Sequence, residues 1–273
     1  MTTPVKLSAF AAVLALVLGA AALAGGAVGQ IHDPAVAAKD EMSMEVDLMR
    51  GLAVSENGLT LDLARRTARP NQPFRLAFRI LGKDGRAVRD FDVEHTKRMH
   101  LIVVRRDLTG FQHLHPTLRA DGTWTTSLTL PQAGTYRVFA DFSASNQPTT
   151  LADDLQVDGN VSSRELPAPA KFALTDGFGV RRTDGTVRAD QESGLTFSVT
   201  RNGRPVALQD YLGAKGHLVA LREGDLAFLH VHPDANSLRF EATFPTGHSY
   251  RLFLQFKVAG QVHTAAFTLE VAR

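Results

Sequence analysis

Ten histidines occur in the chain, and six of them belong to one spacing that appears twice. The spacing is His-x12-His-x-His-Pro, with one copy in each half of the sequence. Its histidines are His100, His113 and His115 in the first copy and His217, His230 and His232 in the second. Imidazole is the commonest metal ligand in proteins and the side chain that titrates near neutral pH. A duplicated group of three therefore predicts a metal site.

The composition limits the kind of site that these residues can make. The chain contains no cysteine, so imidazole, thioether, carboxylate or backbone groups would have to hold a metal. Three imidazoles can ligate copper or zinc and leave a coordination position open. We expect copper, with zinc as the alternative. Neither copy has a carboxylate at a repeated offset to act as general base. The sequence also lacks a phosphate loop and a nucleophile paired with a base, which favours a binding protein over an enzyme.

Two other interpretations fit the same histidines. They could hydrogen-bond backbone carbonyl groups and stabilise an interface between two domains, which makes the protein a structural or interaction module of the cell envelope. They could also form a sensor whose charge changes as the pH falls. The proline that ends each copy, Pro116 or Pro233, could simply terminate a strand.

Two residues near the first copy are replaced by residues of a different type in the second half. His95 lies five residues before the first copy, where the second half has Leu212 or Gly213. If His95 contributes, the two sites differ. Met99 corresponds to Gly216, and it would need a bulge to join the site because adjacent strand residues face opposite sides.

Hairpin geometry predicts that the three histidines of each copy converge. In the second copy, EGDL at 223–226 is a hairpin sequence with Gly-Asp at the centre of the turn. A two-residue loop there would pair His217 with His232 further along the strands. Opposite residues, and residues two apart on one strand, share a face, so His217, His230 and His232 would form one patch. The first copy would form the same patch over a longer turn.

The sequence from residue 51 onward is typical of short β-strands. Apolar or alternating runs are separated by turn sequences such as 82–85, 107–110 and 131–134. No segment after the N-terminal region keeps a helical period. The expected strands cover 60–63, 74–80, 101–105, 112–115, 124–130, 136–142 and 151–157, then 195–200, 217–221, 227–232, 238–244, 250–258 and 264–271.

The two halves match beyond the histidines, which indicates an internal duplication. DGRAV at 84–88 corresponds to NGRPV at 202–206, and YRVF at 136–139 corresponds to YRLF at 250–253. We therefore predict an all-β protein with two tandem immunoglobulin-like β-sandwich domains after an N-terminal hydrophobic helix. The predicted domains are 51–158 and 171–273, and a polar, proline-bearing linker at 159–170 joins them.

The N-terminal region predicts export. Residues 7–24 are apolar and uncharged. Residues 1–30 are therefore expected to be a signal peptide, with an A-x-A cleavage pattern at 22–24, or a membrane anchor helix. Residues 31–50 are expected to form a flexible tether. The tether contains Met42, Met44 and Met49, whose soft thioethers suit a soft metal.

The charge pattern bears on partners. The formal net charge is +2, and no cluster of lysine and arginine with interleaved aromatics occurs, so nucleic acid is not expected as a partner. The partners expected are the metal ion, another metal-handling protein of the envelope, and the membrane if the N-terminal helix is retained.

The repeat segments resemble a family of bacterial, often actinobacterial, exported proteins that are loosely described as heavy-metal-binding. The resemblance rests on MHLIVVRRDLTGFQHLHP at 99–116 after Glu94-His95, and on GHLVALREGDLAFLHVHP at 216–233 after YLGA at 211–214. GLAVSENGLTL at 51–61, DGTW at 121–124 and YRVFADF at 136–142 also support it. Lys215 departs from it, because an apolar or aromatic residue is expected there. The resemblance implies an extracytoplasmic, copper-linked protein, either secreted or anchored in the cell membrane and facing outside, with no established reaction.

Overall fold

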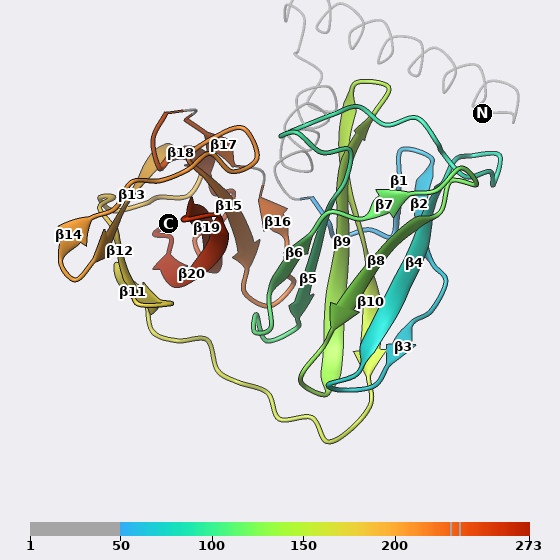
Figure 1. Ribbon diagram of the computed structural model, residues 1–273, viewed down its shortest axis with the longest axis horizontal. Helices are drawn as coiled ribbons and strands as arrows, with labels where there is room; N and C mark the ends of the chain where they lie inside the picture. The colour runs from blue at the N-terminus through green and yellow to red at the C-terminus, as the bar shows by residue number, and fades with distance from the viewer. Residues whose placement is uncertain (1–49, 230, 235) are drawn as a thin grey trace, which may run out of the picture. The chain divides into compact units, whose positions relative to one another are not determined.

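The computed structural model of the protein describes residues 50–229, 231–234 and 236–273 (Figure 1). In this part of the chain no helix is long and apolar enough to span a membrane. The signal peptide or anchor helix predicted for residues 1–30 lies outside the described residues. The same holds for residues 31–49 of the predicted tether, including its three methionines.

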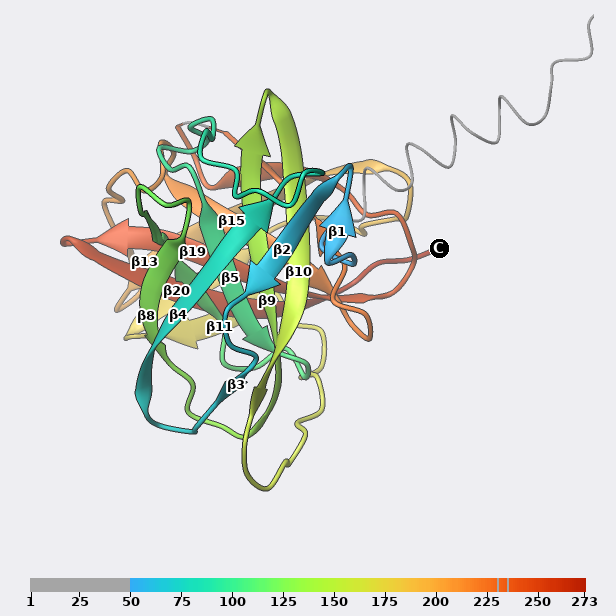
Figure 2. The same cartoon turned by 90° about the vertical axis from the view of Figure 1, so that its right-hand side faces the viewer.

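Residues 55–157 form two five-stranded sheets. Their strands are β1 (Ser55–Glu56), β2 (Leu59–Leu63), β3 (Thr67–Ala68), β4 (Pro73–Leu81), β5 (His100–Arg105), β6 (Gln112–Leu114), β7 (Thr117–Leu118), β8 (Trp124–Thr129), β9 (Gly134–Ala144) and β10 (Gln147–Val157). One sheet has the order β1-β2-β4-β8-β7 and the other β3-β10-β9-β5-β6. In the first sheet the order β2-β4-β8-β7 is that of the ABED sheet of immunoglobulin domains. In the second sheet the order β5-β9-β10 is that of their CFG sheet. Figure 2 shows the two layers one in front of the other.

The second half of the chain repeats this arrangement closely. Its strands are β11 (Phe172–Thr175), β12 (Phe178–Arg182), β13 (Glu192–Arg201), β14 (Arg204–Pro205), β15 (Gly216–Arg222), β16 (Phe228–Leu229), β17 (His232–Pro233), β18 (Arg239–Thr243), β19 (Ser249–Val258) and β20 (Gln261–Glu270). They form a sheet β11-β12-β13-β18-β17, with β14 beside β13, and a sheet β16-β15-β19-β20. The parallel pairing of β3 with β10 recurs as a parallel bridge between Arg188 and Ala272. The repeated topology agrees with the duplication predicted from the sequence.

The all-β class is confirmed, and every run predicted as a strand contains one. The run predicted at 250–258, for example, is the strand Ser249–Val258. One prediction is wrong in detail: residues 227–232 do not form a single strand, because they divide into β16 and β17 in different sheets. The strands that the patterns missed are β1, β3, β7, β11, β12 and β14. Four of these six are two-residue strands, and a strand that short has no apolar alternation to detect.

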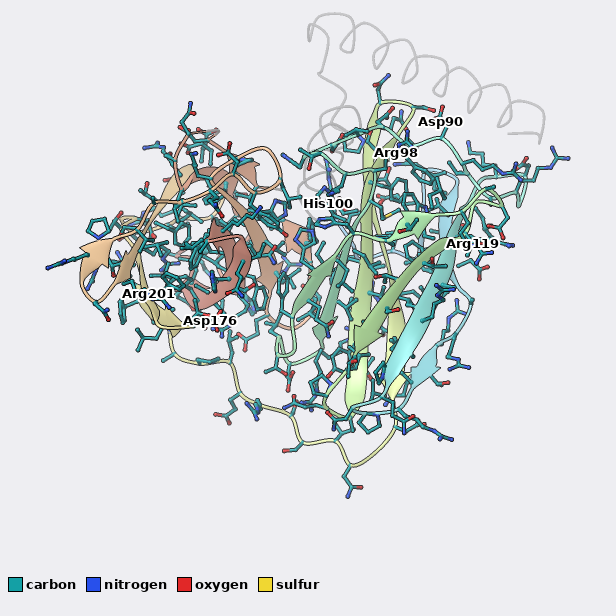
Figure 3. All side chains as sticks on the ribbon, in the orientation of Figure 1. Asp90, Arg98, His100, Arg119, Asp176 and Arg201 are labelled. Carbon is teal, nitrogen blue, oxygen red and sulfur yellow. The ribbon has the colours of Figure 1, made fainter. Side chains whose placement is uncertain are left out.

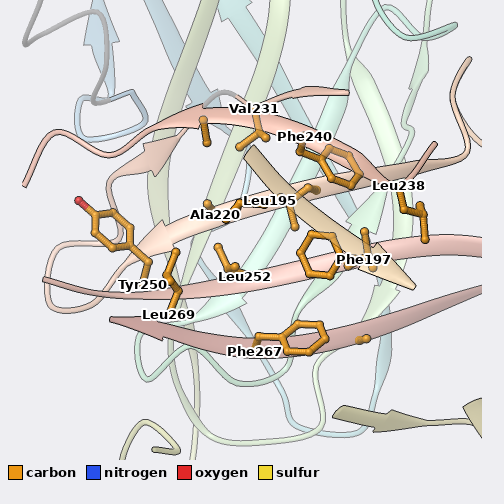
Figure 4. Close-up of a cluster of buried hydrophobic side chains, with 14 of the residues drawn as sticks. Leu195, Phe197, Ala220, Val231, Leu238, Phe240, Tyr250, Leu252, Phe267 and Leu269 are labelled. Carbon is orange, nitrogen blue, oxygen red and sulfur yellow. The ribbon is translucent and has the colours of Figure 1, made fainter. Parts of the chain in front are cut away.

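Each half has a hydrophobic core between its own two sheets. In the first half, Leu76 and Phe78 of β4 pack in one buried cluster with Tyr136 of β9 from the opposite sheet. In the second half, Leu195 and Phe197 of β13 pack with Leu252 and Phe267 in the same way (Figure 4). Full burial of one such side chain is worth roughly 1.5–3 kcal/mol, so each half has an apolar core of its own.

Strands β5 and β15 are buried on both faces. All six residues of β5 are buried. Leu101 faces the core of the first half, whereas its neighbour Ile102 faces the second half. In β15, Leu218 faces the core of the second half and Val219 faces the first half. A strand that is covered on both sides has no need of polar alternation. The continuous apolar sequences HLIVVR and HLVAL reflect this position.

A third apolar cluster, which we call the junction, joins the β9-β5 sheet of the first half to the β15-β19 sheet of the second. Its aromatic contacts are reciprocal. Phe111 stacks on Phe253 with ring centroids 4.1 Å apart, and their counterparts Phe228 and Phe139 contact each other at 5.7 Å. Reciprocal contacts between equivalent residues are the mark of a two-fold interface. The halves therefore pack with pseudo-two-fold symmetry. The buried members of the junction are Ile102, Val104, Leu108, Phe139, Ala152, Val219, Leu221, Leu226, Phe228 and Phe253.

Candidate metal centre

The alternation along β5 and β15 places one histidine from each half at the junction. His100 lies two residues before Ile102, and His217 lies two residues before Val219, so both share the face of the junction residues. Their rings are stacked, with an interplanar angle of 8° and centroids 5.6 Å apart. Figure 3 shows His100 on the side of the first half that faces the second. The first histidines of the two copies therefore meet.

The three histidines of the first copy converge as the hairpin register predicts. Strand β6 pairs with β5 so that His113 lies opposite Ile102, which puts it beside His100 on the same face. One ligand atom from each of His100, His113 and His115 lies within 4.8 Å of the other two. His100 is the most deeply buried of the three, with 3% of its surface exposed.

The second copy departs from its predicted geometry. The register is confirmed as far as β16, where Leu221 pairs with Phe228. Beyond that point the chain leaves the sheet, and His232 pairs with Glu241 of β18 in the opposite sheet. The predicted cross-strand pair of His217 with His232 is therefore wrong. The reason is that Val231 is buried in the core of the second half, which draws this segment across the sandwich. His230 lies outside the described residues, and only the main chain of His232 is described.

The turn of the second copy also differs from the prediction. The backbone N–H of Leu226 donates to the carbonyl of Arg222 over 3.1 Å, and the N–H of Arg222 donates to the carbonyl of Ala227. Two residues thus face one, which is a bulge in place of a two-residue loop. Leu226 accordingly adopts a positive φ of 61°. The bulge leaves the register of the strands unchanged.

Gln255 is a site residue that the sequence patterns missed. It lies on β19 opposite His217, and its Oε1 is 2.6 Å from the Nδ1 of His113. It is also nearly buried, with 5% of its surface exposed. The only signal in the sequence is its position across the strand from a motif histidine. Its counterpart in the first half, Asp141, lies opposite His100 in the same way.

The hydrogen-bond partners of His100 and His113 determine which ring nitrogens carry protons. The Nε2 of His100 lies 3.2 Å from the backbone carbonyl of Glu94, which can only accept, so this nitrogen donates. The Nδ1 of His113 likewise donates to the Oε1 of Gln255. A neutral imidazole has one N–H, so with the Gln255 amide in this orientation the Nδ1 of His100 and the Nε2 of His113 are both bare acceptors. These two atoms lie only 3.0 Å apart.

His115 brings a third nitrogen to the cluster. Its Nε2 is buried and has no hydrogen-bond partner among the described residues. A buried polar atom left in that state costs about 1–3 kcal/mol, so it marks a place where an ion or water fits. His100, His113 and His115 together bring one ring nitrogen each to within 4.8 Å of the other two. This arrangement suits a cation.

Burial keeps the clustered histidines neutral. Desolvation, together with repulsion from His100, lowers the pKa of His113 to about 3 and that of His115 to about 4. Burial also lowers the pKa of His217 well below its ordinary value, with repulsion from His113 adding to the effect. The pKa of His100 is lowered by burial, although the carboxylate of Asp141 opposes the shift. Neutral imidazole is the form that binds metal.

The two unrepeated residues of the first half have different positions. His95 lies at the cluster, with its ring centroid 6.1 Å from that of His100 and 5.9 Å from that of His217. Met99 lies in the core of the first half, where 1% of its surface is exposed. The alternation along the strand predicts that Met99 faces away from the site, and the structure agrees.

Comparisons with known proteins give a family but no function. The model of a family described as "Domain of unknown function (DUF8832)" matches twice, at residues 53–159 and at residues 173–273. No curated protein matches the chain. The two matches cover the two halves whose topology repeats.

Solved structures share only a distant likeness. The adhesin FdeC of Escherichia coli is 14% identical, with a TM-score of 0.29 over 81% of this chain and 66% of that chain. The alpha-2-macroglobulin of Escherichia coli is 12% identical, with a TM-score of 0.29 over 78% of this chain and 20% of that one. The adhesin InvE of Yersinia pseudotuberculosis is 16% identical, with a TM-score of 0.25 over 80% of this chain and 60% of that one. This chain thus spans only part of the length of each, and the description of the fold rests on strand order.

Proposed function

The chain belongs to the DUF8832 family, whose function is unknown, and from that premise we propose that it is a non-catalytic β-sandwich protein of the cell envelope with one metal-dependent junction. Its histidines stabilise the contact between the two halves, and they take up a transition-metal ion there. Copper is the ion that we expect, with zinc as the alternative. The proposed ligands are His100, His113 and His115 from the first half and His217 from the second.

One observation supports the metal more than any other. The bare nitrogens of His100 and His113 face each other at 3.0 Å, while the Nε2 of His115 is buried without a partner among the described residues. Two lone pairs at that distance repel unless a cation lies between them. A proton could serve, but burial lowers the pKa of His113 to about 3 and so disfavours it. A metal ion would satisfy all three nitrogens at once.

The spacing of the nitrogens fits such an ion after a small adjustment. Two imidazole nitrogens that each lie ~2.0–2.1 Å from a tetrahedral ion are roughly 3.3 Å apart. The separation of 3.0 Å between His100 and His113 is close to that value. The widest separation in the cluster is 4.8 Å, so one ring has to move inward on binding.

The remaining parts of the proposal concern architecture and location. We take each half to be an immunoglobulin-like domain, because its strand order is that of the ABED and CFG sheets. We place the protein outside the cytoplasm, secreted or anchored in the membrane, because residues 7–24 are apolar and uncharged. A protein of this kind would bind, buffer or deliver the metal together with another metal-handling protein of the envelope.

Metal titration of the purified chain tests the proposal. We expect one copper ion per chain, and affinity about 100-fold or more weaker in the double variant His113→Ala/His115→Ala. His217→Ala should also weaken binding, because the site is shared between the halves. His248→Ala is the matched control, since the side chain of this exposed histidine hydrogen-bonds only to Ser249 among the described residues. Equal copper and zinc binding by the wild type and the double variant, or none by either, would refute the metal site.

A second candidate function is a junction held without metal. If the Gln255 amide were turned over, its Nε2 would donate to His113, and the Nε2–H of His113 would then donate to His100. Amide orientation is inferred from hydrogen bonding, so the two arrangements are distinguished by the tautomer of His113. Nitrogen-15 NMR of the metal-free chain reads that tautomer directly. A proton on Nε2 of His113, with unfolding free energy lost in His113→Ala/His115→Ala without metal, would favour this second function.

A further inference from the structure

The turn that carries His95 has a backbone conformation that its other central residue, Thr96, does not favour. The backbone groups of Glu94 and Lys97 hydrogen-bond to each other in both directions, at 2.8 and 2.9 Å. The two central residues, His95 and Thr96, have positive φ angles of 46° and 69°. Such turns favour asparagine, aspartate or glycine, and a β-branched residue at positive φ is an outlier. Strained positions of this kind gather at functional sites.

The second half contains the same turn with a glycine at its second central position. Tyr211 and Ala214 exchange backbone hydrogen bonds of 2.7 and 3.3 Å. The central residues are Leu212 and Gly213, with φ angles of 56° and 84°. The fold therefore forms this turn whether or not a histidine is present. The histidine at position 95 is not needed to make the turn.

The two turns lie side by side at the junction. A Cβ added to Gly213 would be 3.7 Å from the Cγ2 of Thr96. In this position the ring of His95 lies edge-on to both His100 and His217, one from each half. The carbonyl of Glu94, on the same turn, accepts a hydrogen bond from the Nε2–H of His100. One turn therefore fixes the tautomer of a buried histidine and adds a ring beside it.

The His95 turn borders solvent. Thr96, Lys97 and Arg98 are exposed, and 62% of the surface of Val93 is exposed. His100, by contrast, is buried. An ion that approaches from solvent along this turn meets His95 before it reaches the buried nitrogens.

We propose that His95 is a further ligand of the metal centre, and that it is the ligand through which the ion enters and leaves. This inference rests on the proposed metal function. The centre then takes ligands from three strands, from the segment after β6 and from one turn, and only the first half supplies the entry ligand. The incoming ion is first held at the exposed edge by His95 and then by the buried rings.

Copper titration of the full chain, followed by electron paramagnetic resonance, tests the inference. The variant His95→Leu places in the first turn the residue that the second turn already has at Leu212. His95→Asn is a second variant, because asparagine accepts positive φ. His248→Leu is the control. We expect both His95 variants to show one coordinated nitrogen fewer on Cu²⁺ and about tenfold faster loss of copper to a chelator.

The outcomes separate this inference from the proposed function. If the wild type binds copper, and both His95 variants match it in nitrogen count and in the rate of loss, the entry ligand is refuted while the metal site stands. If the wild type binds neither copper nor zinc, both proposals fail. If only His95→Leu differs and His95→Asn matches the wild type, the effect comes from the turn, and the role of ligand is refuted.

Discussion

Strands β9 and β19 occupy equivalent places in the two halves, yet they present different side chains to the neighbouring strand. Asp141 of β9 lies opposite His100, and Gln255 of β19 lies opposite His217. The Asp141 carboxylate accepts a hydrogen bond from Thr150, whereas Gln255 accepts one from His113 across the junction. The same backbone thus supplies a charged group on one side and a neutral acceptor on the other. A duplicated fold has been given an asymmetric site.

A second difference concerns how closely the strands approach. A Cβ added to Gly216 would lie 2.5 Å from Leu238 Cδ2 and 2.8 Å from the carbonyl oxygen of Gln255. The equivalent residue of the first half, Met99, instead fills the core. The pseudo-two-fold relation therefore holds for the junction face of these strands, while their inner faces are packed differently. Symmetry was retained in the aromatic contacts of the junction.

The largest effect is expected from breaking the reciprocal aromatic contacts. Phe139 and Phe253 are 0% and 4% exposed and lie at equivalent positions in the junction. Replacing either by alanine should cost about 3–5 kcal/mol of unfolding free energy, because a large buried side chain is lost. If the pseudo-two-fold symmetry of the junction extends to its energetics, the losses of unfolding free energy in the two variants agree to within about 1 kcal/mol. Urea unfolding measures them.

Phe172→Ala is the control for this pair, because 47% of its surface is exposed. It should change the unfolding free energy by less than about 1 kcal/mol. Two separate unfolding transitions in Phe253→Ala, with the first half unaffected, would show that the junction does not couple the halves.

A middle-sized effect is expected from pH in the metal-free chain. Burial lowers the pKa of His113 to about 3 and of His115 to about 4, whereas the unfolded chain takes up these protons near pH 6.5. The folded state therefore binds fewer protons, and its stability is full above pH 6.5 and declines as the pH falls toward the folded pKa values. Between pH 6.5 and 5.5 the two histidines together should remove about 2 kcal/mol.

Denaturant unfolding at a series of pH values checks this prediction. The variant His113→Ala/His115→Ala should flatten the pH dependence, while His248→Ala in the second half should leave it unchanged. An equal slope in all three proteins would mean that the clustered histidines are not held neutral.

The smallest effect is expected at the paired turns. Thr96→Gly gives the first turn the glycine that the second turn has at Gly213, and it removes a β-branched residue from a φ of 69°. We expect a gain of about 0.5–1 kcal/mol, because relief of strain exceeds the entropy cost of glycine. Gly213→Thr should lose at least as much. Thermal unfolding of both variants measures the two changes in stability. A loss of stability in Thr96→Gly would contradict the backbone strain inferred at Thr96.

The sequence indicated much of the fold but only part of the site. Period-2 runs and turn residues were enough for the longer strands, and the two copies of the motif revealed the repeat. The convergence of His100, His113 and His115 followed from local hairpin register. The pairing of His217 with His232 failed, because burial of Val231 in the core carries the chain to the other sheet. Local pairing rules do not include this competition between hairpin pairing and burial of an apolar side chain in the core.

The residue types and spacings by themselves determined that three histidines of one copy share a face, since strand alternation and hairpin pairing act over a few residues. Only the tertiary structure decided that the two copies meet in one place. The junction brings His217 beside His100 and Gln255 beside His113, over separations of more than a hundred residues. Burial between two halves then sets the protonation of these rings and leaves their nitrogens facing one another. Packing of apolar faces, which no spacing records, turned a repeated motif into one candidate site.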